Sequence, residues 1–277
     1  MTEFISSVEN PLFKKVCLLQ ASGHIGQKAR LSYGQAFLEG VHLIQTWLGD
    51  PALAVLLTSE EGLANSEVSK AISGHLDKCP KTRIYQLDSI LWKKLSNLPN
   101  SPHFAGLIEL PKLRKNLMLP SSDRLDGDVL LLDRIQDAGN VGSILRTAVA
   151  AGFSQVVSIS GCAHLWSSKV LRAGMGAHRF LQLYEGWSHE QALRTISAPL
   201  LVTTVQGEFG LYELREKLQG PVAWVFGNEG SGVSEDLLKL GQHVSIPIGT
   251  QIESLNVSTA AAVCLFETAR MRMANPK

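Results

Sequence analysis

The chain has little cysteine and no long apolar run. These two shortages argue against a disulfide-rich, zinc-binding or membrane-spanning protein. Its 277 residues include four scattered cysteines, without a CxxC pair or a histidine at ligand spacing, which argues against a disulfide framework and a zinc site. No segment approaches the roughly 18–20 apolar residues of a membrane span, and the first residues do not resemble a signal peptide. We therefore expect a cytoplasmic protein with reduced, mostly buried thiols, no metal and no membrane association.

The chain also carries almost no net charge. Lys and Arg together number 26 and Asp and Glu 25, a balance of +1, so there is no global attraction to nucleic acid. Residues 1–115 carry +3 and the remainder −2, an asymmetry too small to show RNA binding but one that says where to look for basic patches. Hydrophobic residues make up 45%, enough for one large or two ordinary domains.

Strand and helix patterns alternate along the chain, which predicts an α/β protein. Residues 1–110 predict a small α/β domain, and the polar stretch 111–126 predicts a linker. From Asp128 the alternation resumes and predicts a second domain, residues 127–277, with a mostly parallel sheet. Its predicted strands are 128–134, 155–160, 200–205, 222–226 and 243–248, and its predicted helices are 141–151, 211–218, 234–240 and 256–273.

Three of these predicted strands end in polar loops that share a design. Residues 136–142, 227–232 and 249–258 each place Gly, Asn and one or two charged groups directly after a strand. In the third loop Ser254 and Asn256 can cap the helix that follows. Because ligands bind at the carboxyl ends of the strands in an open α/β sheet, the three loops are candidates for one site.

Familiar phosphate and nucleophile motifs fit these loops poorly. Residues 227–234 have the glycine spacing of a P-loop, but Val233 occupies the lysine position and Glu229 would repel phosphate. The spacing of Gly139 and Gly142 is not that of a dinucleotide fingerprint. None of the eight histidines lies in the loops and no G-x-S-x-G occurs, which argues against a serine hydrolase. The remaining cation, Arg146, with one carboxylate and several amides and hydroxyls, suits positioning and electrostatic catalysis.

Taken together, the three loops resemble the motifs of the SpoU/TrmH family of RNA ribose 2′-O-methyltransferases, in the SPOUT superfamily. The first resembles the family's acidic-x-x-N-x-G-x-x-x-R run at Asp137, Asn140, Gly142 and Arg146. The second resembles its G-N-E-x-x-G at Gly227, Asn228, Glu229 and Gly232, and the third its I-P-(x)-S-L-N-V-S at Ile246, Pro247 and residues 254–258. Asn10-Pro11 and residues 37–42 resemble, less specifically, the substrate-binding domain that many members carry.

This resemblance implies a fold, a cofactor and a partner. The implied fold is a carboxyl-terminal, mostly parallel sheet with a deep trefoil knot, a rare exception to unknotted topology, preceded by a small α/β substrate-binding domain. The implied cofactor is S-adenosylmethionine, and the implied assembly is a homodimer in which each site takes Arg146 from one subunit and the cofactor from the other. The cofactor-binding residues implied are Thr204, Gly207, Gly227, Ile246, Leu255 and Asn256.

The resemblance also assigns roles for attack of a ribose 2′-hydroxyl on the methyl group. Because a guanidinium with a pKa above 12 rarely releases its proton, we expect Arg146 to orient the hydroxyl and the adjacent phosphate and to stabilise developing charge. Asn140 would fix the Arg146 loop and the nucleotide, while Glu229 would orient Arg146 or Asn140. Ser254 and Asn256 would shape the cofactor and ribose pocket. The predicted RNA-binding residues are Lys14, Lys15, Lys28, Arg30, Lys169 and Arg172.

The substrate leaves alternatives open. A separate amino-terminal domain favours ribosomal RNA over transfer RNA. A non-catalytic RNA-binding protein on the same fold would share most of the sequence, but the presence of both Arg146 and Glu229 argues against it. An enzyme that methylates a base nitrogen is a third alternative, and the resemblance of the Asn140/Arg146 loop and residues 254–256 to the ribose-methylating branch argues against that one.

Overall fold

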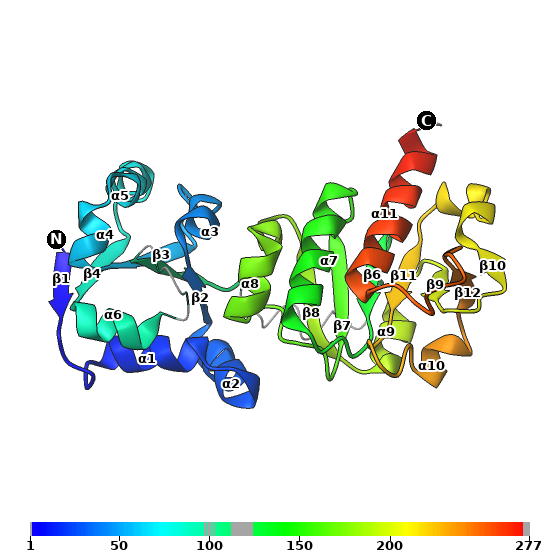
Figure 1. Ribbon diagram of the computed structural model, residues 1–277, viewed down its shortest axis with the longest axis horizontal. Coiled ribbons are helices and arrows are strands. Elements are labelled where there is room, and N and C mark those ends of the chain that lie inside the picture. The colour runs from blue at the N-terminus through cyan, green and yellow to red at the C-terminus, as the bar shows by residue number, and fades with distance from the viewer. Residues whose placement is uncertain (1, 97, 99–100, 102, 112–123, 274–277) are drawn as a thin grey trace. The chain divides into compact units, whose positions relative to one another are not determined.

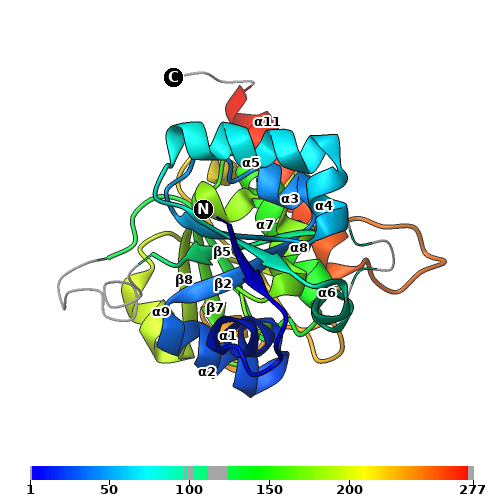
Figure 2. The same ribbon diagram turned by 90° about the vertical axis from the view of Figure 1, so that its left-hand side faces the viewer.

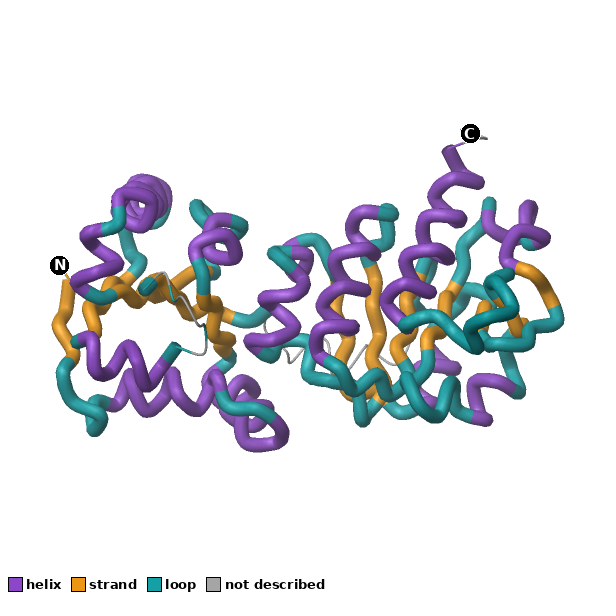
Figure 3. The backbone as a smooth tube through the Cα atoms, viewed as in Figure 1, coloured by secondary structure: helices purple, strands orange, loops and turns teal. Residues whose placement is uncertain are grey.

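The chain folds into two compact units, each with its own sheet. The computed structural model describes residues 2–96, 98, 101, 103–111 and 124–273. One unit holds residues 1–113 and 166–176, and the other holds residues 114–165 and 177–277. Figure 1 shows the elements of both units, and Figure 3 shows their strands bordered by helices. The predicted linker 111–126 lies mostly outside the described residues.

The first unit contains a mixed five-stranded sheet in the order β1-β4-β3-β5-β2. Strands β1, β4 and β3 pair in parallel, whereas β5 runs antiparallel to β3 and β2. Within residues 1–110 the sequence pattern predicts a strand end at 37–42 and strands at 52–58 and 83–87, and the structure has β2, β3 and β4 there. It adds two strands that the pattern did not reveal, β1 and β5. The bounds are β1 Thr2–Ile5, β2 Gln35–Glu39, β3 Leu53–Thr58, β4 Arg83–Leu87 and β5 Phe104–Glu109.

Helices cover both faces of this sheet. Helices α3 Val41–Gln45, α4 Glu60–Ala64 and α5 Ser66–Lys78 lie on one face, and α1 Pro11–Gln20, α2 Gly23–Tyr33 and α6 Ser89–Leu95 on the other (Figures 1 and 2). The unit also includes α8 Ser168–Gly174. Trp92 of α6 is 1% exposed and packs with Phe37 and Leu57 in the core beneath α1 and α6.

One sequence-based expectation in this unit is wrong. We expect a loop from about Ser22, and the structure instead has helix α2 over residues 23–33. The two glycines at its start weaken the helical pattern. Gly26 is required by packing, because a Cβ there would lie 1.7 Å from the carbonyl oxygen of Ala21 at the end of α1.

The second unit contains a seven-stranded parallel sheet in the order β10-β12-β9-β11-β6-β7-β8. The predicted parallel sheet is thereby confirmed, although strands β8 and β10 and helix α9 were not anticipated. The strand bounds are β6 Val129–Leu132, β7 Gln155–Ile159, β8 Gln182–Trp187, β9 Leu200–Thr203, β10 Phe209–Gly210, β11 Ala223–Phe226 and β12 Gln242–Ser245.

Helices again border both faces of this sheet. Helix α7 Ala138–Ala150 packs on α11 Val257–Met273 over one face. Helices α9 His189–Thr195 and α10 Glu235–Leu238 contribute Ala192 and Leu237 to the core of the other face. The predicted helix 211–218 is instead two 3-10 turns, η2 Leu211–Glu213 and η3 Arg215–Leu218, and a third, η1, covers Ala177–Arg179.

The thiols are less buried than expected, and the described residues show neither a metal-ligating cluster nor a membrane-spanning helix. All four cysteines are free thiols, but only Cys264 is buried and the other three are partly exposed, so the expectation of mostly buried thiols is wrong. Within the described ranges, no cluster of three or more metal-ligating side chains is found. The same residues contain no helix long and apolar enough to cross a membrane.

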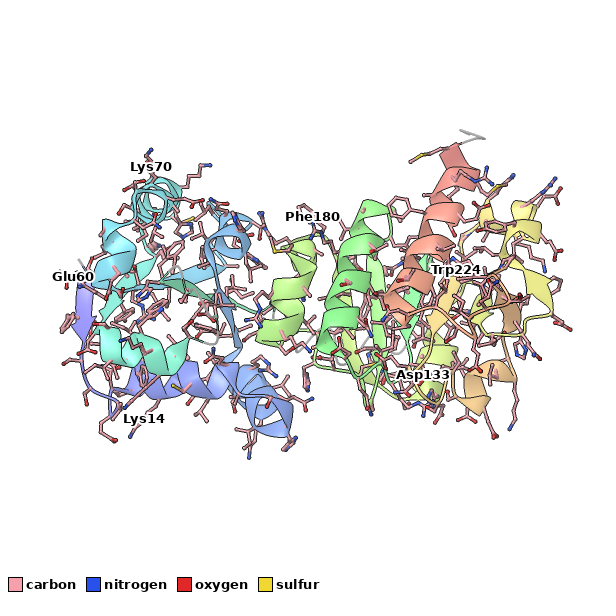
Figure 4. The ribbon with its side chains drawn as sticks, in the orientation of Figure 1. Lys14, Glu60, Lys70, Asp133, Phe180 and Trp224 are labelled. Atoms are coloured by element: carbon pink, nitrogen blue, oxygen red, sulfur yellow. The ribbon has the colours of Figure 1, made fainter. Side chains whose placement is uncertain are left out.

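We predict that Thr268→Val destabilises the second unit. Trp224 Nε1 donates to Thr268 Oγ1 at 3.0 Å, and both residues are 0% exposed; Figure 4 labels Trp224 where the sheet meets α11. Valine keeps the shape but leaves the buried indole N–H without its acceptor, so the unfolding free energy should fall by about 1–3 kcal/mol. Denaturant titration measures it, with the exposed Thr259→Val on the same helix as control; equal midpoints for the two variants would contradict the prediction.

Candidate functional site

One side chain, Asn140, joins the three loops that follow β6, β11 and β12. Its Nδ2 donates to Glu229 Oε1 at 3.0 Å, and its Oδ1 accepts from Asn256 Nδ2 at 3.1 Å. The two bonds use the donor and the acceptor of a single amide, so they also fix which way the amide faces. Loops that are far apart in the sequence thus converge at one edge of the parallel sheet.

Local hydrogen bonds at the starts of two helices hold Asn140 and its partner Asn256 in place. Asp137 caps α7, since its Oδ1 accepts from the Asn140 backbone N–H at 2.8 Å. Asn256 caps α11 in the same way: its Oδ1 accepts from the backbone N–H of Ser258 at 2.9 Å. Because capping uses the Asn256 oxygen, its amide nitrogen remains to donate to Asn140.

The loop that carries Glu229 is folded back on itself. Asn228 and Gly232 exchange backbone hydrogen bonds of 3.0 and 2.9 Å, and Asn228 Oδ1 accepts from the Gly230 N–H at 2.9 Å. Gly227 permits this turn, because a Cβ there would lie 2.3 Å from the Val233 nitrogen. A larger residue at position 227 would force the loop open.

A cavity of about 600 Å³ lies against these loops, within the range of small-molecule and cofactor sites. Its walls come from the ends of β9, β11 and β12, from both later loops and from the start of α11. The lining includes apolar side chains such as Val244, Ile246 and Leu255 together with the polar Glu229 and Ser254.

The charge of this cavity has one sign. Two carboxylates, Glu229 and Glu253, lie among its described lining residues, and no Lys, Arg or His does. Such walls favour a cationic ligand and disfavour phosphate. The lining residue Thr204 has a buried Oγ1 without a hydrogen-bond partner among the described residues, and a buried hydroxyl left in this way is suited to bond a ligand.

Comparison with known proteins identifies this arrangement. The model of the SpoU rRNA Methylase family matches residues 128–266, half of the chain and all three loops. The chain belongs to the SpoU rRNA methylase family.

Individual family members are similar over nearly the whole chain. An uncharacterised tRNA/rRNA methyltransferase of Synechocystis is 31% identical, covering 98% of this chain and 94% of its own. A 23S rRNA guanosine 2′-O-methyltransferase of Bacillus subtilis is 27% identical, covering 87% of this chain and 90% of its own. The AdoMet-bound rRNA methyltransferase of Sinorhizobium meliloti shares the fold, with a TM-score of 0.77, 21% identity and coverage of 100% and 99% of the two chains.

The structure gathers most of the residues that the SpoU motifs single out. Thr204, Gly227, Ile246, Leu255 and Asn256 all line the cavity, as do Glu229 and Ser254. Gly207 is not among the lining residues. It packs instead on β12, where a Cβ at this position would lie 2.4 Å from the Ser245 nitrogen.

Arg146 stands apart from the other SpoU motif residues. It is exposed on α7 and is not among the residues that line the cavity. It lies six positions after Asn140, which on an α-helix means about 9 Å along the axis and a different face. No described residue forms a hydrogen bond or ion pair with its guanidinium. The arginine is therefore free to meet a group from outside its own chain.

The predicted RNA-binding residues fall into different environments. Arg30 is only 2% exposed and donates to the Leu19 carbonyl oxygen at 2.8 Å, so it stabilises the end of α1 and does not fit the RNA-contact role predicted for it. Lys14 pairs with Glu9, and the Lys15 ammonium lies 5.0 Å from the Tyr33 ring centroid. Lys28 is exposed on α2, and Lys169 and Arg172 lie on α8.

Two residues at this edge were not singled out by the sequence. Asp133, labelled in Figure 4, is 0% exposed and follows β6 directly. Its Oδ2 accepts from the Ser234 N–H at 2.6 Å, where the Glu229 loop ends. The neighbouring Arg134 accepts from Asn228 Nδ2 at 2.9 Å through its backbone oxygen. The signal available in the sequence was a pair of charged residues at the end of an apolar strand.

The Glu229 carboxylate titrates below its usual range. Burial acts to raise its pKa, but hydrogen bonds from Asn140 and from backbone N–H groups, among them Gln136 and Asp137, together outweigh burial and lower it. A lowered carboxyl pKa stabilises the fold above the unfolded pKa, and this contribution is lost as pH falls through the folded value. The loop network should therefore weaken in acid, below about pH 4.5.

We predict that Asn140→Ala raises the pKa of Glu229 toward its ordinary value, because it removes the side-chain donor at 3.0 Å. Carbon-13 NMR titration of the glutamate carboxyls measures the shift. Asn256→Ala is the matched control, since it removes the other bond to Asn140 and leaves the Glu229 contact in place. A Glu229 titration that moves equally in the two variants would show that the direct bond is not the cause.

Proposed function

We propose that the chain transfers a methyl group from S-adenosylmethionine to a ribose 2′-hydroxyl of ribosomal RNA. Membership of the SpoU family gives the reaction class, and the similar Bacillus subtilis protein is a 23S rRNA 2′-O-methyltransferase. The observation that carries the proposal is the Asn140 amide, which ties the three motif loops together beside a cavity with acidic walls.

The cavity fits the cofactor in size and charge. Bound there, S-adenosylmethionine supplies an electrophilic methyl group on a positively charged sulfur. Glu229 and Glu253 supply negative charge around it, Thr204 supplies an uncommitted hydroxyl, and the apolar side chains of Ile246 and Leu255 suit its uncharged parts. The lack of any cation among the described lining residues keeps the RNA phosphates outside this cavity.

The proposed catalytic roles follow from what each side chain contacts. Glu229 accepts a hydrogen bond from Asn140, which supports the role of orienting Asn140, and Asn140 in turn holds the start of α7 against Asn256. Ser254 and Asn256 line the cavity and shape the place of the ribose. Arg146 stabilises negative charge on the ribose oxygen, because a guanidinium is a hydrogen-bond donor and not a base.

A homodimer supplies the arginine in this proposal. Arg146 is exposed and lies on a different face of α7 from the Asn140 network, so each chain presents a cofactor cavity and an arginine at separate places. Two copies that exchange these places complete two sites. The proposal also includes a deep trefoil knot in the carboxyl-terminal domain. Its support is that β12 inserts between β9 and β10, while the following α11 returns to pack on α7.

The proposal assigns a cellular location and domain roles, and it leaves two alternatives that experiments can distinguish. The proposal places the enzyme in the cytoplasm, residues 1–110 as the RNA-binding domain and residues 127–277 as the catalytic domain. Transfer RNA is the second candidate substrate, since the similar Synechocystis protein is a tRNA/rRNA methyltransferase. A protein that binds RNA without catalysis would not need the acidic cavity.

The test of the function is incubation with labelled S-adenosylmethionine and, separately, unmodified ribosomal and transfer RNA, followed by digestion and identification of the labelled nucleoside. A 2′-O-methylated nucleoside from ribosomal RNA is the expected result. Label in transfer RNA alone would show that transfer RNA, and not ribosomal RNA, is the substrate. A methylated base would show that the enzyme methylates a base and not a ribose. No cofactor binding would favour the non-catalytic alternative.

We predict that Arg146→Ala lowers the turnover number by about 10²–10³-fold, the usual loss for a group that stabilises transition-state charge. The Kd for S-adenosylmethionine, measured by calorimetry, should stay within about twofold, because Arg146 does not line the cavity. Arg194→Ala, an exposed arginine on α9, is the control and should have wild-type turnover. Turnover in the Arg146 variant equal to that of the control would refute the assigned role.

We predict that two inactive variants restore activity when mixed. Ala260 lines the cavity, so Ala260→Trp should fill it and block cofactor binding while leaving Arg146 intact. In a heterodimer of the Ala260→Trp chain and the Arg146→Ala chain, one of the two shared sites combines the arginine of the first chain with the open cavity of the second. Random exchange of subunits should therefore recover about a quarter of wild-type activity. No recovery after proven exchange would mean that each site uses its own arginine.

A further inference from the structure

Arg134 adopts a backbone conformation that is uncommon for a residue with a side chain. Its φ is +57°. Among the described non-glycine residues, only His103 and Met175 also have a positive φ, of 51° and 43°. In the left-handed region the Cβ crowds the following backbone, and residues held there concentrate at functional sites. The position is one that glycine or asparagine would occupy with less strain, so the arginine side chain calls for a reason.

A buried carboxylate fixes the direction of this side chain. Arg134 Nε donates to Asp133 Oδ1 at 3.0 Å, and a second, longer bond of 3.4 Å joins Nη2 to Asp133 Oδ2. Asp133 also accepts from the Ser234 N–H at 2.6 Å and lies 3.2 Å from His189 Nε2. The Asp133 carboxylate therefore accepts hydrogen bonds from several donors, of which the arginine is only one.

Both members of the pair are charged at neutral pH. Burial acts to raise the pKa of Asp133, but the hydrogen bonds from Arg134, Ser234 and His189 together lower it. The bond to Asp133 raises the pKa of Arg134. The guanidinium is therefore a permanent cation in a fixed orientation.

One edge of the guanidinium faces away from its protein partners. The Arg134 side chain is 35% exposed. Its Nη2 reaches the Gly232 carbonyl oxygen at 3.4 Å, whereas Nη1 has no hydrogen bond within the described part of the chain. Asp133 alone could be held by Ser234 and His189, so the arginine is not needed to satisfy the carboxylate.

The position of Arg134 connects it to the Asn140 network. Its backbone oxygen accepts from Asn228 Nδ2 at 2.9 Å, and its guanidinium reaches Gly232 at the other end of the same loop. Two and three residues further along, the N–H groups of Gln136 and Asp137 lie 3.4 Å from the Glu229 carboxylate. A cation therefore lies on the loop beside the acidic cavity that itself holds none.

We propose that Arg134 binds a backbone phosphate of the RNA substrate close to the target ribose. A guanidinium with a fixed orientation and exposed N–H donors is the group that best matches a phosphate. The acidic lining repels phosphate, so a cation just outside it would set where the RNA backbone passes. This inference rests on the proposed RNA methyltransferase function and adds a substrate contact from the same chain that supplies Asn140.

The test compares Arg134→Gln with Arg134→Lys, which carry the same backbone strain and differ in charge. For the glutamine variant we expect the KM for RNA to rise about tenfold with the turnover number nearly unchanged, and the salt dependence of RNA binding to fall by about one phosphate contact. The lysine variant should retain most of the affinity. The Kd for S-adenosylmethionine should match the wild type in both variants.

Further variants separate binding from folding. Arg134→Gly relieves the strain and should raise the KM as the glutamine variant does, with a thermal midpoint at or above that of the wild type. Arg194→Ala controls for the loss of any surface arginine. Wild-type KM and salt slope in the glutamine and glycine variants would overturn the inference. A raised KM that follows a loss of cofactor affinity or of thermal stability would equally overturn it, because the role would then be structural.

The same assay separates this inference from the proposed function. If the wild-type chain puts no 2′-O-methyl group on any RNA, the proposed function fails and the phosphate contact fails with it. If the wild type methylates RNA and the Arg134 variants keep its KM and salt slope, only the phosphate contact fails.

Discussion

The structure of the site depends on a single amide that has to satisfy two neighbours at once. Asn140 donates to Glu229 and accepts from Asn256, and these three residues belong to the segments that follow three different strands, β6, β11 and β12. An aspartate at position 140 would place a second carboxylate against Glu229, and an alanine would leave the other two loops without a common partner. Each loop is also capped or folded by its own hydrogen bonds, so the amide aligns segments that have local hydrogen bonds of their own.

Charge is separated in space around this amide. The cavity beside it has two carboxylates and no cation among its described lining residues, whereas Arg134 and Arg146 lie outside it, on the loop before α7 and on α7 itself. A cationic methyl donor and a polyanionic acceptor need opposite surroundings. In the proposed function, keeping the two charges on different surfaces would let one enzyme hold both partners without either occupying the place of the other.

The parallel sheet explains why the loops meet. Strands β6, β11 and β12 all run in one direction, so their carboxyl ends share an edge, and the residues that follow them are brought together although up to 116 positions separate them in sequence. The predicted strands 128–134 and 222–226 contain β6 and β11. Strand β8, the two-residue strand β10 and the 3-10 turns at 211–218 were missed or misassigned, because their residues lack a clear period and their conformation is set by the neighbouring elements.

The reaction family, the alternation of strands and helices from residue 128 onward, and the residues that form the three loops could all be predicted from the sequence. Local patterns carry this information: apolar strands, helix-capping residues and glycines at tight turns can be read in order along the chain. Three features could be learned only from the folded chain: Glu229 bonds to Asn140, Arg30 is buried against the end of α1, and Arg134 is held by Asp133 in a left-handed conformation. Those outcomes depend on which distant groups come within hydrogen-bond distance, and no spacing along the chain specifies that.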